Sequence, residues 1–187
     1  MEARYDNVNV DDKLLIEGCK KSERRYQELL YRKYAREMYH IALSYAGDKE
    51  EASDILQEAF LKVFRNVEDF RDKGSLKAWI RRIVSNTALD YYRSRKRLGF
   101  TQAVDESYDI PAAEENDVEI KHGAEEVFSM IRQLPEGARI IFQLFAVEGY
   151  SHKEIADKMN ISESTSKSQY QRARSLLIKM LNKREAS

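Results

Sequence analysis

Apolar side chains recur every three or four residues along most of this chain, and this spacing constrains its fold more than any other feature. Residues 52–67 and 76–91 each carry an apolar stripe of this kind without interruption. Side chains three or four positions apart share one face of an α-helix, whereas a strand needs strict alternation of apolar and polar residues. Such alternation is hard to find here, and only two prolines and seven glycines occur among 187 residues. The sequence therefore predicts an all-α protein.

The helical spacing stops in one internal segment. Between residues 98 and 121 acidic side chains accumulate, hydrophobic residues become rare and Pro111 interrupts the chain. Low hydrophobicity with concentrated like charge favours an extended linker over a packed element. The sequence thus predicts two small helical domains, residues 1–97 and 122–187, joined by a flexible acidic linker over 98–121.

Capping residues predict where the helices of the first domain begin. Short polar side chains are favoured at a helix N-terminus because they accept hydrogen bonds from backbone N–H groups that have no partner inside the helix. The expected helix starts are at Asp11 or Asp12, at Ser22, at Asp48 and at Ser75.

The charges balance overall but are segregated along the chain. Lysine plus arginine and aspartate plus glutamate each number 32, a balance that alone argues against a nucleic-acid partner. However, residues 71–97 carry nine basic and two acidic side chains, whereas residues 105–126 carry nine acidic and one basic. This asymmetry indicates that the basic segment can contact nucleic acid.

Composition and motifs exclude several other classes of protein. Cys19 is the single cysteine, so no disulfide framework can form and a reducing compartment is expected. The N-terminal residues do not resemble a signal peptide, and no run approaches about 18 apolar residues, so we expect a cytoplasmic protein. The three histidines are far apart and no phosphate-binding glycine loop or nucleophile motif occurs. We therefore expect no metal, no cofactor, no small-molecule substrate and no catalysis.

Residues 151–181 predict two helices bent around a short turn. Ser151 and Glu154 fit a capping box at the start of the first helix, Asn160 can adopt the left-handed conformation that ends it, and Ser162 can begin the second. The outer face of the second helix is rich in hydrogen-bond donors, which suits the major groove of DNA. An ordinary helix pair with a solvated face would have the same local pattern, so this segment needs support from elsewhere in the chain.

Three ordered motifs supply that support. They read DILQEAFLKVFRNV at 54–67, GSLKAWIRRIVSNTALDYYRSRKR at 74–97 and LPEGARIIFQLFAVEGYSHKEIA at 134–156. With them, residues 25–97 resemble region 2 of bacterial sigma-70 factors and residues 122–181 resemble region 4. The chain is similar to the extracytoplasmic-function (ECF) group, which keeps only these two regions. The resemblance implies a factor that binds core RNA polymerase, directs it to specific promoters and promotes strand opening.

The resemblance implies two surfaces on the first domain. The helix at 54–67 would dock on the coiled coil of the polymerase clamp through Asp54, Gln57, Glu58, Leu61 and Arg65. The loop and helix from residue 70 onward would recognise and open the minus-ten promoter element, where exposed bases need aromatic and basic side chains to hold them. The expected minus-ten residues are Phe70, Arg71, Ser75, Lys77, Arg81, Arg82, Asn86, Tyr92 and Arg93. Of the aromatic residues on this helix, Trp79 and Tyr91 are expected in the core, which leaves Tyr92 as the candidate for stacking.

In the second domain the resemblance implies recognition of the minus-thirty-five element. The expected residues are Ser164, Thr165, Lys167, Ser168, Gln171 and Arg172, with Ser151 and Lys153 holding phosphates. Ser166 departs from the family pattern, because relatives often carry an aliphatic residue there. It falls on the buried side of the helix, where a serine is expected to thin the core.

Several alternatives remain open from the sequence. The acidic linker can be a solvated tether, or it can thread the RNA exit channel of polymerase as the resemblance implies. The resemblance also implies an anti-sigma partner, commonly a membrane-bound one. A stand-alone helix-turn-helix regulator with an N-terminal sensing or dimerisation domain is the main competing reading, but such a domain would not need the basic helix at 75–97. A small recombinase would require a catalytic Ser or Tyr in an acid–base cluster, which we do not find.

Overall fold

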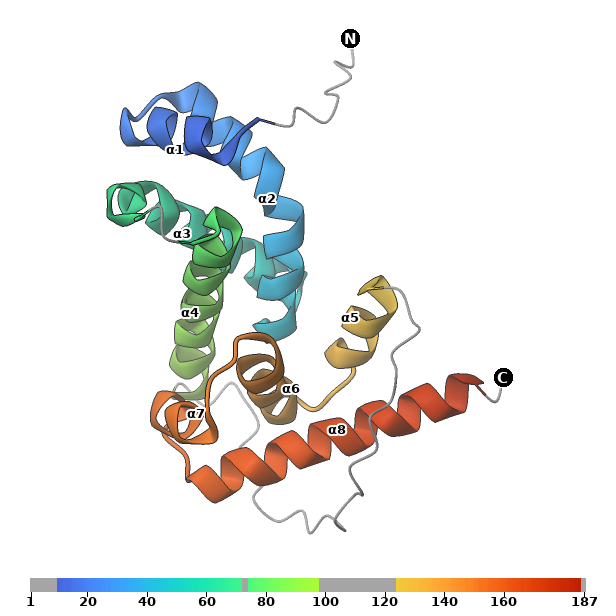
Figure 1. The fold of residues 1–187 in the computed structure, drawn as a ribbon. Helices are drawn as coiled ribbons and strands as arrows, with labels where there is room; N and C mark the ends of the chain where they lie inside the picture. The colour runs from blue at the N-terminus through green and yellow to red at the C-terminus, as the bar shows by residue number, and fades with distance from the viewer. Residues whose placement is uncertain (1–9, 72–73, 98–123, 186–187) are drawn as a thin grey trace.

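The computed structural model describes residues 10–71, 74–97 and 124–185, and that part of the chain is built from helices without a β-strand. This confirms the predicted all-α fold (Figure 1). The linker predicted at 98–121 lies outside the described residues, as do Asp72 and Lys73 of the loop before the basic helix.

The first helical unit is made of residues 10–97. Its elements are α1 (Asp12–Lys20), α2 (Arg24–Tyr45), α3 (Lys49–Arg65), the 3-10 turn η1 (Val67–Asp69) and α4 (Leu76–Arg97). Helices α2, α3 and α4 pack against one another, and α1 packs on α2 (Figure 1). Leu30, Phe60 and Ile80, one from each of these three helices, are excluded from solvent. The two predicted apolar stripes therefore face one common core.

The second unit is made of the helices that follow the linker. They are α5 (Ala124–Arg132), α6 (Glu136–Phe142), a π-helical turn η2 (Gln143–Val147), α7 (His152–Met159) and α8 (Glu163–Glu185). Pro135 separates α5 from α6, and α6 runs directly into η2. Helices α6 and α7 pack on α8, the long helix drawn in red in Figure 1.

Most of the predicted helix starts are confirmed. Helices α1, α3 and α4 begin directly after Asp11, Asp48 and Ser75. At the best-formed of these caps, Asp48 Oδ1 accepts the backbone N–H of Glu51 at 2.8 Å.

The start predicted at Ser22 is wrong, because Ser22 ends α1 instead of beginning α2. Its backbone is left-handed, with φ of 57°, and α2 begins at Arg24. The N–H of Ser22 donates to the carbonyl of Cys19, and the N–H of Glu23 donates to the carbonyl of Gly18. This pair of bonds is the Schellman pattern of a helix C-terminus. A serine can occupy either end of a helix, and here tertiary packing of α1 on α2 decided which.

The two units pack directly against each other, which the sequence did not predict. Ile140 and Ile141 of α6 and Ile155 of α7 are fully buried in the same apolar cluster as the core of the first unit. Figure 1 shows α6 and α7 lying between α8 and one end of the α2–α4 bundle. We call the contact between residues 10–97 and residues 124–185 the seam.

Candidate nucleic-acid and polymerase interfaces

Helices α7 and α8 form the helix-turn-helix that the sequence predicts. The Ser151 Oγ accepts the N–H of Glu154 at 3.3 Å, and the Glu154 carboxylate accepts the N–H of Ser151 at 2.8 Å, which completes the capping box. Asn160 ends α7 with φ of 52° and ψ of 53°, the predicted left-handed conformation. Ser162 Oγ then accepts the N–H of Thr165 at 3.0 Å at the start of α8. Every bond in this turn is local, so the sequence could predict it.

The outer face of α8 leaves most of the predicted minus-thirty-five side chains in solvent. Ser164, Lys167, Ser168 and Gln171 are exposed, and Arg172 is half-buried. Lys167 pairs with Glu163 of the same helix at 2.7 Å, both side chains being largely exposed. An exposed pair of this kind is weak because solvent screens it, so it would not prevent Lys167 from contacting DNA.

Two of the predicted contact residues are already engaged within the protein. Thr165 is 9% exposed, and its hydroxyl lies 2.7 Å from the Ser162 hydroxyl. The Ser151 hydroxyl donates to the Glu154 carboxylate at 2.8 Å. The Ser151 hydroxyl therefore serves the cap of α7 and the Thr165 hydroxyl the turn into α8, so the Thr165 side chain is not a free DNA contact. Lys153, by contrast, is exposed beside this turn.

A buried polar and aromatic cluster supports α8 from beneath, and the sequence did not reveal it. Ser166 is fully buried, and its hydroxyl lies 3.0 Å from Nδ1 of His152. The His152 ring stacks on Phe145 with centroids 4.3 Å apart and meets Tyr170 edge-on. The predicted burial of Ser166 is correct, but the imidazole of His152 occupies the space where we expected a thinner core. Burial, aided by the nearby Lys167 charge, lowers the pKa of His152.

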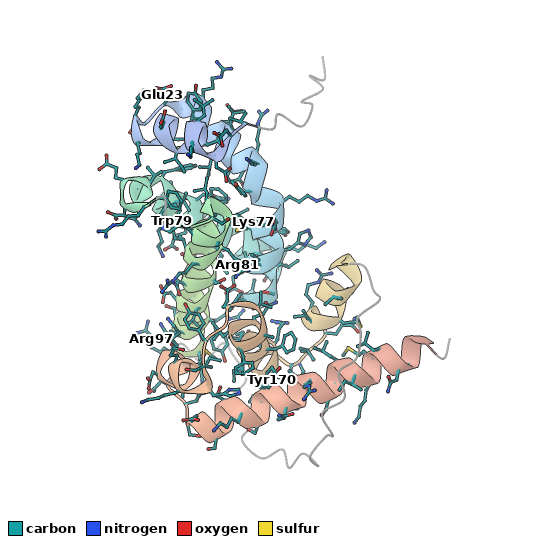
Figure 2. All side chains as sticks on the ribbon, in the orientation of Figure 1. Glu23, Lys77, Trp79, Arg81, Arg97 and Tyr170 are labelled. Atoms are coloured by element: carbon teal, nitrogen blue, oxygen red, sulfur yellow. The ribbon has the colours of Figure 1, made fainter. Side chains whose placement is uncertain are left out.

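Helix α4 and the residues just before it carry the predicted minus-ten side chains. Arg71, Ser75, Lys77 and Arg82 are exposed, and Asn86 is half-buried. Lys77 pairs with Glu37 of α2 at 2.8 Å. Figure 2 shows Lys77 and Arg81 on one side of α4 and Trp79 on another.

The aromatic residues at this surface differ from the prediction. Tyr92, the predicted stacking residue, is only 2% exposed, whereas Tyr91 is half-buried. The assignment of Tyr92 is therefore wrong for this arrangement, because packing of the second unit on the end of α4 covers it. Phe70 is 7% exposed and packs edge-on against Trp79 with centroids 5.4 Å apart. Trp79 and Tyr91 are both partly buried against the core, in agreement with their predictions.

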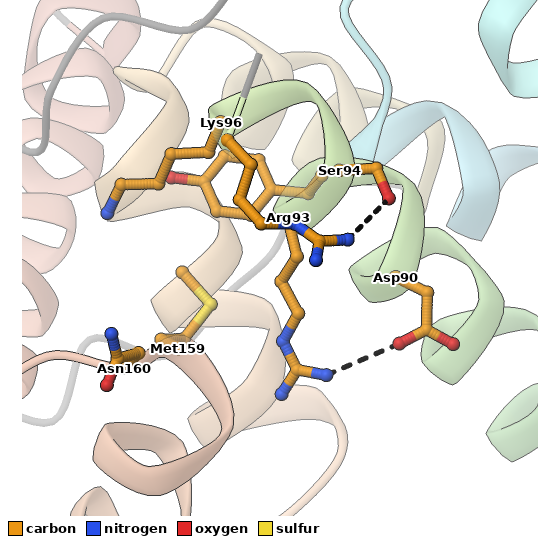
Figure 3. Close-up of a pocket in the computed structure, with 8 residues that line it drawn as sticks. Asp90, Arg93, Ser94, Lys96, Met159 and Asn160 are labelled. Carbon is orange, nitrogen blue, oxygen red and sulfur yellow. Dashed lines mark hydrogen bonds and ion pairs between the residues drawn. The ribbon is translucent and has the colours of Figure 1, made fainter. Parts of the chain in front are cut away.

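Two of the predicted minus-ten arginines lie in the seam. Arg81 donates to the carbonyl of Val147 at 3.3 Å, and its Nε lies 3.6 Å from the Glu148 carboxylate. Arg93 donates to the carbonyl of Lys158 in α7 and pairs with Asp90 at 3.3 Å. A basic hollow of about 640 Å³ opens next to Arg93, with Lys96, Arg97, Met159 and Asn160 among its lining (Figure 3).

The outer face of α3 carries an exposed apolar side chain between polar ones. Leu61 is 54% exposed, the most exposed of three large hydrophobic side chains that reach solvent in the described part of the chain. Asp54, Gln57 and Arg65 on this face are exposed, and Glu58 is half-buried and pairs with Lys62 at 2.9 Å. Leu61 and Arg65 also border a hollow whose apolar lining includes Phe64 and Val67. The five predicted docking residues thus form one continuous surface with an apolar centre.

Neither a metal site nor a membrane-spanning helix is found among the described residues. Within 10–71, 74–97 and 124–185, no three His, Cys, Asp or Glu side chains gather where they could hold a metal ion. None of the described helices combines the length and the apolar composition that a membrane-spanning segment requires.

Comparison with known protein families gives two matches. The model of Sigma-70 region 2 matches residues 30–98, and the model of Sigma-70 region 4 matches residues 124–177. These are the two parts of the chain that carry α2–α4 and α5–α8.

Curated relatives agree with these matches. The ECF RNA polymerase sigma factor SigM of Bacillus subtilis is 30% identical over 164 residues, which cover 82% of this chain and 94% of SigM. The ECF RNA polymerase sigma-E factor of Escherichia coli K12 is 29% identical over 173 residues, covering 87% of this chain and 90% of that protein. SigE of Mycolicibacterium smegmatis is 32% identical over 152 residues, and the match spans only 58% of its length.

Among solved structures, CnrH in complex with the cytosolic domain of CnrY is similar with a TM-score of 0.49 at 22% identity, over 91% of this chain and 97% of CnrH. The sigma factor RpoE of Bartonella quintana, solved with the anti-sigma factor NepR, gives a TM-score of 0.47 at 21% identity, over 83% of this chain and 96% of RpoE. Two consecutive sigma-70 regions and relatives matched over nearly their whole length favour a sigma factor over a stand-alone regulator, and we conclude that this chain belongs to the ECF group of the sigma-70 family of RNA polymerase sigma factors.

Proposed function

We propose that this chain acts as a promoter-specificity subunit with a separate task for each of three helices. Helix α3 docks on the clamp coiled coil of core RNA polymerase, α8 reads the minus-thirty-five element, and α4 holds the opened minus-ten element. Residues 1–97 and 122–187 would act as the two functional domains, with the acidic linker over 98–121 connecting them.

The observation that carries the proposal is the outer face of α8. A capped helix-turn-helix presents exposed Lys167, Ser168 and Gln171 on the first turns of α8, directly after the turn at Asn160. A helix inserted in the major groove uses its N-terminal turns to contact base edges, and Gln can pair with adenine through two hydrogen bonds. Lys167 and Lys153 at the same end would attract the phosphate backbone.

The docking surface on α3 has the composition of a protein interface. An apolar side chain encircled by polar groups can be desolvated at the centre of a contact while the rim stays wet. Leu61 has this position, with Gln57 and Arg65 one helical turn away on either side.

The minus-ten surface is supported by exposed cations near the start of α4. Lys77 and Arg82 can hold the phosphates of a separated strand, and half-buried Asn86 lies on the same helix. We propose that the chemistry of transcription belongs to the polymerase and that this chain is a non-catalytic, cytoplasmic factor. Following the family, we also propose that an anti-sigma protein restrains it.

A reconstituted transcription assay tests the function directly. Mixed with core polymerase and DNA from the promoters it controls, the purified chain should direct initiation at specific sites. Absence of binding to core polymerase in a pull-down would reject the proposed function.

The docking surface has a matched control within the chain. Leu61→Arg should weaken core binding by about tenfold, since loss of one buried leucine at an interface costs on the order of 1.4 kcal/mol or more. Leu14→Arg changes another exposed leucine, 47% exposed on α1, and should leave core affinity unchanged. Equal losses for the two variants would contradict the assignment of the surface.

The DNA surface can be tested in the same way. Lys167→Ala should lower affinity for promoter duplex and reduce the slope of log affinity against log salt by about one, because one phosphate contact is lost. Lys179→Ala, an exposed lysine further along α8, is the matched control. Arg82→Ala should reduce promoter opening more than core binding, and equal reductions would tell against the minus-ten assignment.

A further inference from the structure

A buried hydrogen bond joins the first residue of α7 to the start of α8. Nδ1 of His152 lies 3.0 Å from the hydroxyl of Ser166, and Ser166 is fully excluded from solvent. The two residues are 14 positions apart, so the bond connects two helices instead of capping one. Figure 1 shows α7 at the N-terminal end of α8, and the two helices pack against each other.

Two aromatic rings hold the imidazole in place. Phe145 of η2 stacks on the His152 ring, with centroids 4.3 Å apart and ring planes 13° apart. Tyr170 of α8 meets the His152 ring edge-on at 5.7 Å and also packs against Phe145 at 4.5 Å. The imidazole therefore cannot turn away from Ser166 without losing contacts to both rings.

The imidazole is neutral at neutral pH. Burial, followed by the Lys167 charge, lowers the pKa of His152, and the opposing effect of Glu163 is smaller. In a neutral imidazole one ring nitrogen donates and the other accepts, while a hydroxyl can do either. The hydrogen bond to Ser166 can therefore form in both tautomers of the ring.

The same stretch of α8 carries the proposed base contacts. Lys167 and Ser168 directly follow Ser166 and are exposed, and Gln171 is exposed one turn later. Side chains reach about 5–6 Å from a helix axis, so a rotation of α8 by about 10° would move their tips by about 1 Å. The donor and acceptor atoms of a good hydrogen bond stay within a range of roughly 0.5 Å. A small rotation of α8 is therefore enough to change which base edges these side chains reach.

A buried hydrogen bond limits such a rotation better than apolar packing does. Attraction between apolar side chains has no preferred direction, whereas a buried donor and acceptor must stay aligned or lose their partner. The capping bonds of Ser151 and Ser162 join residues at the start of a single helix, to Glu154 and Thr165. They stabilise α7 and α8 separately and leave the rotation of one helix against the other undefined.

We propose that His152 is a positioning residue for minus-thirty-five recognition, which fixes the rotation of α8 through its hydrogen bond to Ser166 and thereby sets the base preference of the outer face of α8. The inference rests on the proposed function, because it takes α8 as the helix that reads the minus-thirty-five element. It adds two specificity-determining residues that lie beneath the DNA-facing surface instead of on it.

Two substitutions of His152 separate positioning from stability. His152→Phe keeps an aromatic ring for Phe145 and Tyr170 to pack against but removes Nδ1. His152→Asn removes the ring but keeps an amide close to the position of Nδ1, where it can bond the Ser166 hydroxyl. We expect the phenylalanine variant to unfold at the higher temperature and the asparagine variant to keep the base preference closer to wild type. A purely structural role would place the two variants in the same order in both measurements.

Base preference is measured on holoenzyme reconstituted from core polymerase and each variant of the full chain. The probe is one promoter at which the wild-type chain directs initiation, with its minus-thirty-five element randomised and its minus-ten element held constant. Bound duplexes are sequenced, and the enrichment of the best sequence over the library mean is compared between variants. His152→Phe should lower this enrichment by about tenfold, the worth of one good bidentate base contact, and His152→Asn by less than about threefold. Thermal unfolding followed by circular dichroism gives the stability of each free chain.

Two further substitutions control the measurement. Leu181→Ala shortens a side chain that is 9% exposed at the far end of α8, and it should lower the unfolding temperature without changing base preference. Ser166→Ala removes the other partner of the bond and should lower enrichment as His152→Phe does. The double variant should lose no more than either single variant, because residues that act through one bond are not additive.

The possible outcomes are distinct. Equal enrichment by wild type and His152→Phe would overturn the positioning role, and so would enrichment that follows the unfolding temperature across all variants. Ser166→Ala, the smaller change, decides the matter by the same comparison if His152→Phe does not fold. Failure of the proposed function itself would show in the wild-type chain, as absence of binding to core polymerase or as a holoenzyme that enriches no sequence.

Discussion

The turn between α7 and α8 depends on a residue that can adopt a left-handed backbone, and this makes a prediction with a definite sign. Asn160 has φ of 52° and ψ of 53°, and its N–H and that of Ile161 both donate to the carbonyl of Ala156. This conformation costs an ordinary L-residue roughly 1–2 kcal/mol of conformational free energy, whereas glycine adopts it without a steric cost and asparagine tolerates it. Asn160→Ala should therefore lower the free energy of unfolding by about 1 kcal/mol. For a chain of this size that corresponds to a decrease in Tm of roughly 2–4 °C.

Glycine at the same position separates backbone strain from loss of the asparagine side chain. Asn160→Gly should stay within about 0.5 kcal/mol of wild type, because relief of strain offsets the greater entropy of the unfolded chain. Asn66 is a matched control, since it is also a helix C-cap, at the end of α3, but has φ of −105°. There alanine should be tolerated better than glycine. Thermal and guanidinium unfolding followed by circular dichroism measure all four variants. The reasoning would be refuted if the alanine variant were more stable than the glycine variant at both positions, or less stable at both.

Three further predictions concern side chains that are buried or partly buried. Because burial lowers the folded-state pKa of His152, the unfolded chain binds more protons at mildly acidic pH, so stability should be full above about pH 6.5 and fall as the pH drops. In a plot of unfolding free energy against pH, His152→Phe should flatten the slope below about pH 6.5. An unchanged slope would show that a group other than His152 causes the pH dependence. Tyr92→Ala should cost about 3 kcal/mol in guanidinium unfolding and clearly more than Tyr91→Ala, since Tyr92 is 2% exposed; equal costs would contradict the packing at the end of α4. Cys19 should react with iodoacetamide only as fast as the chain unfolds, and rapid reaction of the native protein, measured by mass spectrometry, would exclude its burial.

The successful sequence predictions share a physical basis. The caps at Asp48 and Ser151, the left-handed Asn160 and the start of α8 at Ser162 all depend on hydrogen bonds to residues no more than four positions away. The apolar stripes are equally local, because helical geometry alone sets which side chains share a face. Helical geometry also explains why most residues predicted for the α3 and α8 surfaces are exposed. Their contacts with polymerase and DNA remain predictions.

The errors arose where a residue's partner is distant in sequence. We expected Tyr92 at the surface from its position on the helix alone. That position does not show that the second unit covers the end of α4. Ser166 was expected to leave a thin core because nothing in its neighbourhood pointed to the His152 ring, 14 residues away. Ser22 was assigned to the wrong helix because serine stabilises an N-terminus and tolerates the left-handed turn that ends the preceding helix.

By itself the sequence determined that this chain is helical, where most helices begin, and that α7 and α8 form a capped helix-turn-helix with a donor-rich face. Periodicity shows that a face will be buried, but not which surface will bury it, because that choice depends on contacts between residues far apart in the chain. Only the tertiary structure therefore decided that Arg81 and Arg93 meet helix ends of the second unit 65 to 66 positions along the chain. It also decided that the Glu148 carboxylate is buried against Ser85 and Arg81 of α4. The cations that sequence reasoning assigned to DNA are held, in the packed chain, by the protein itself.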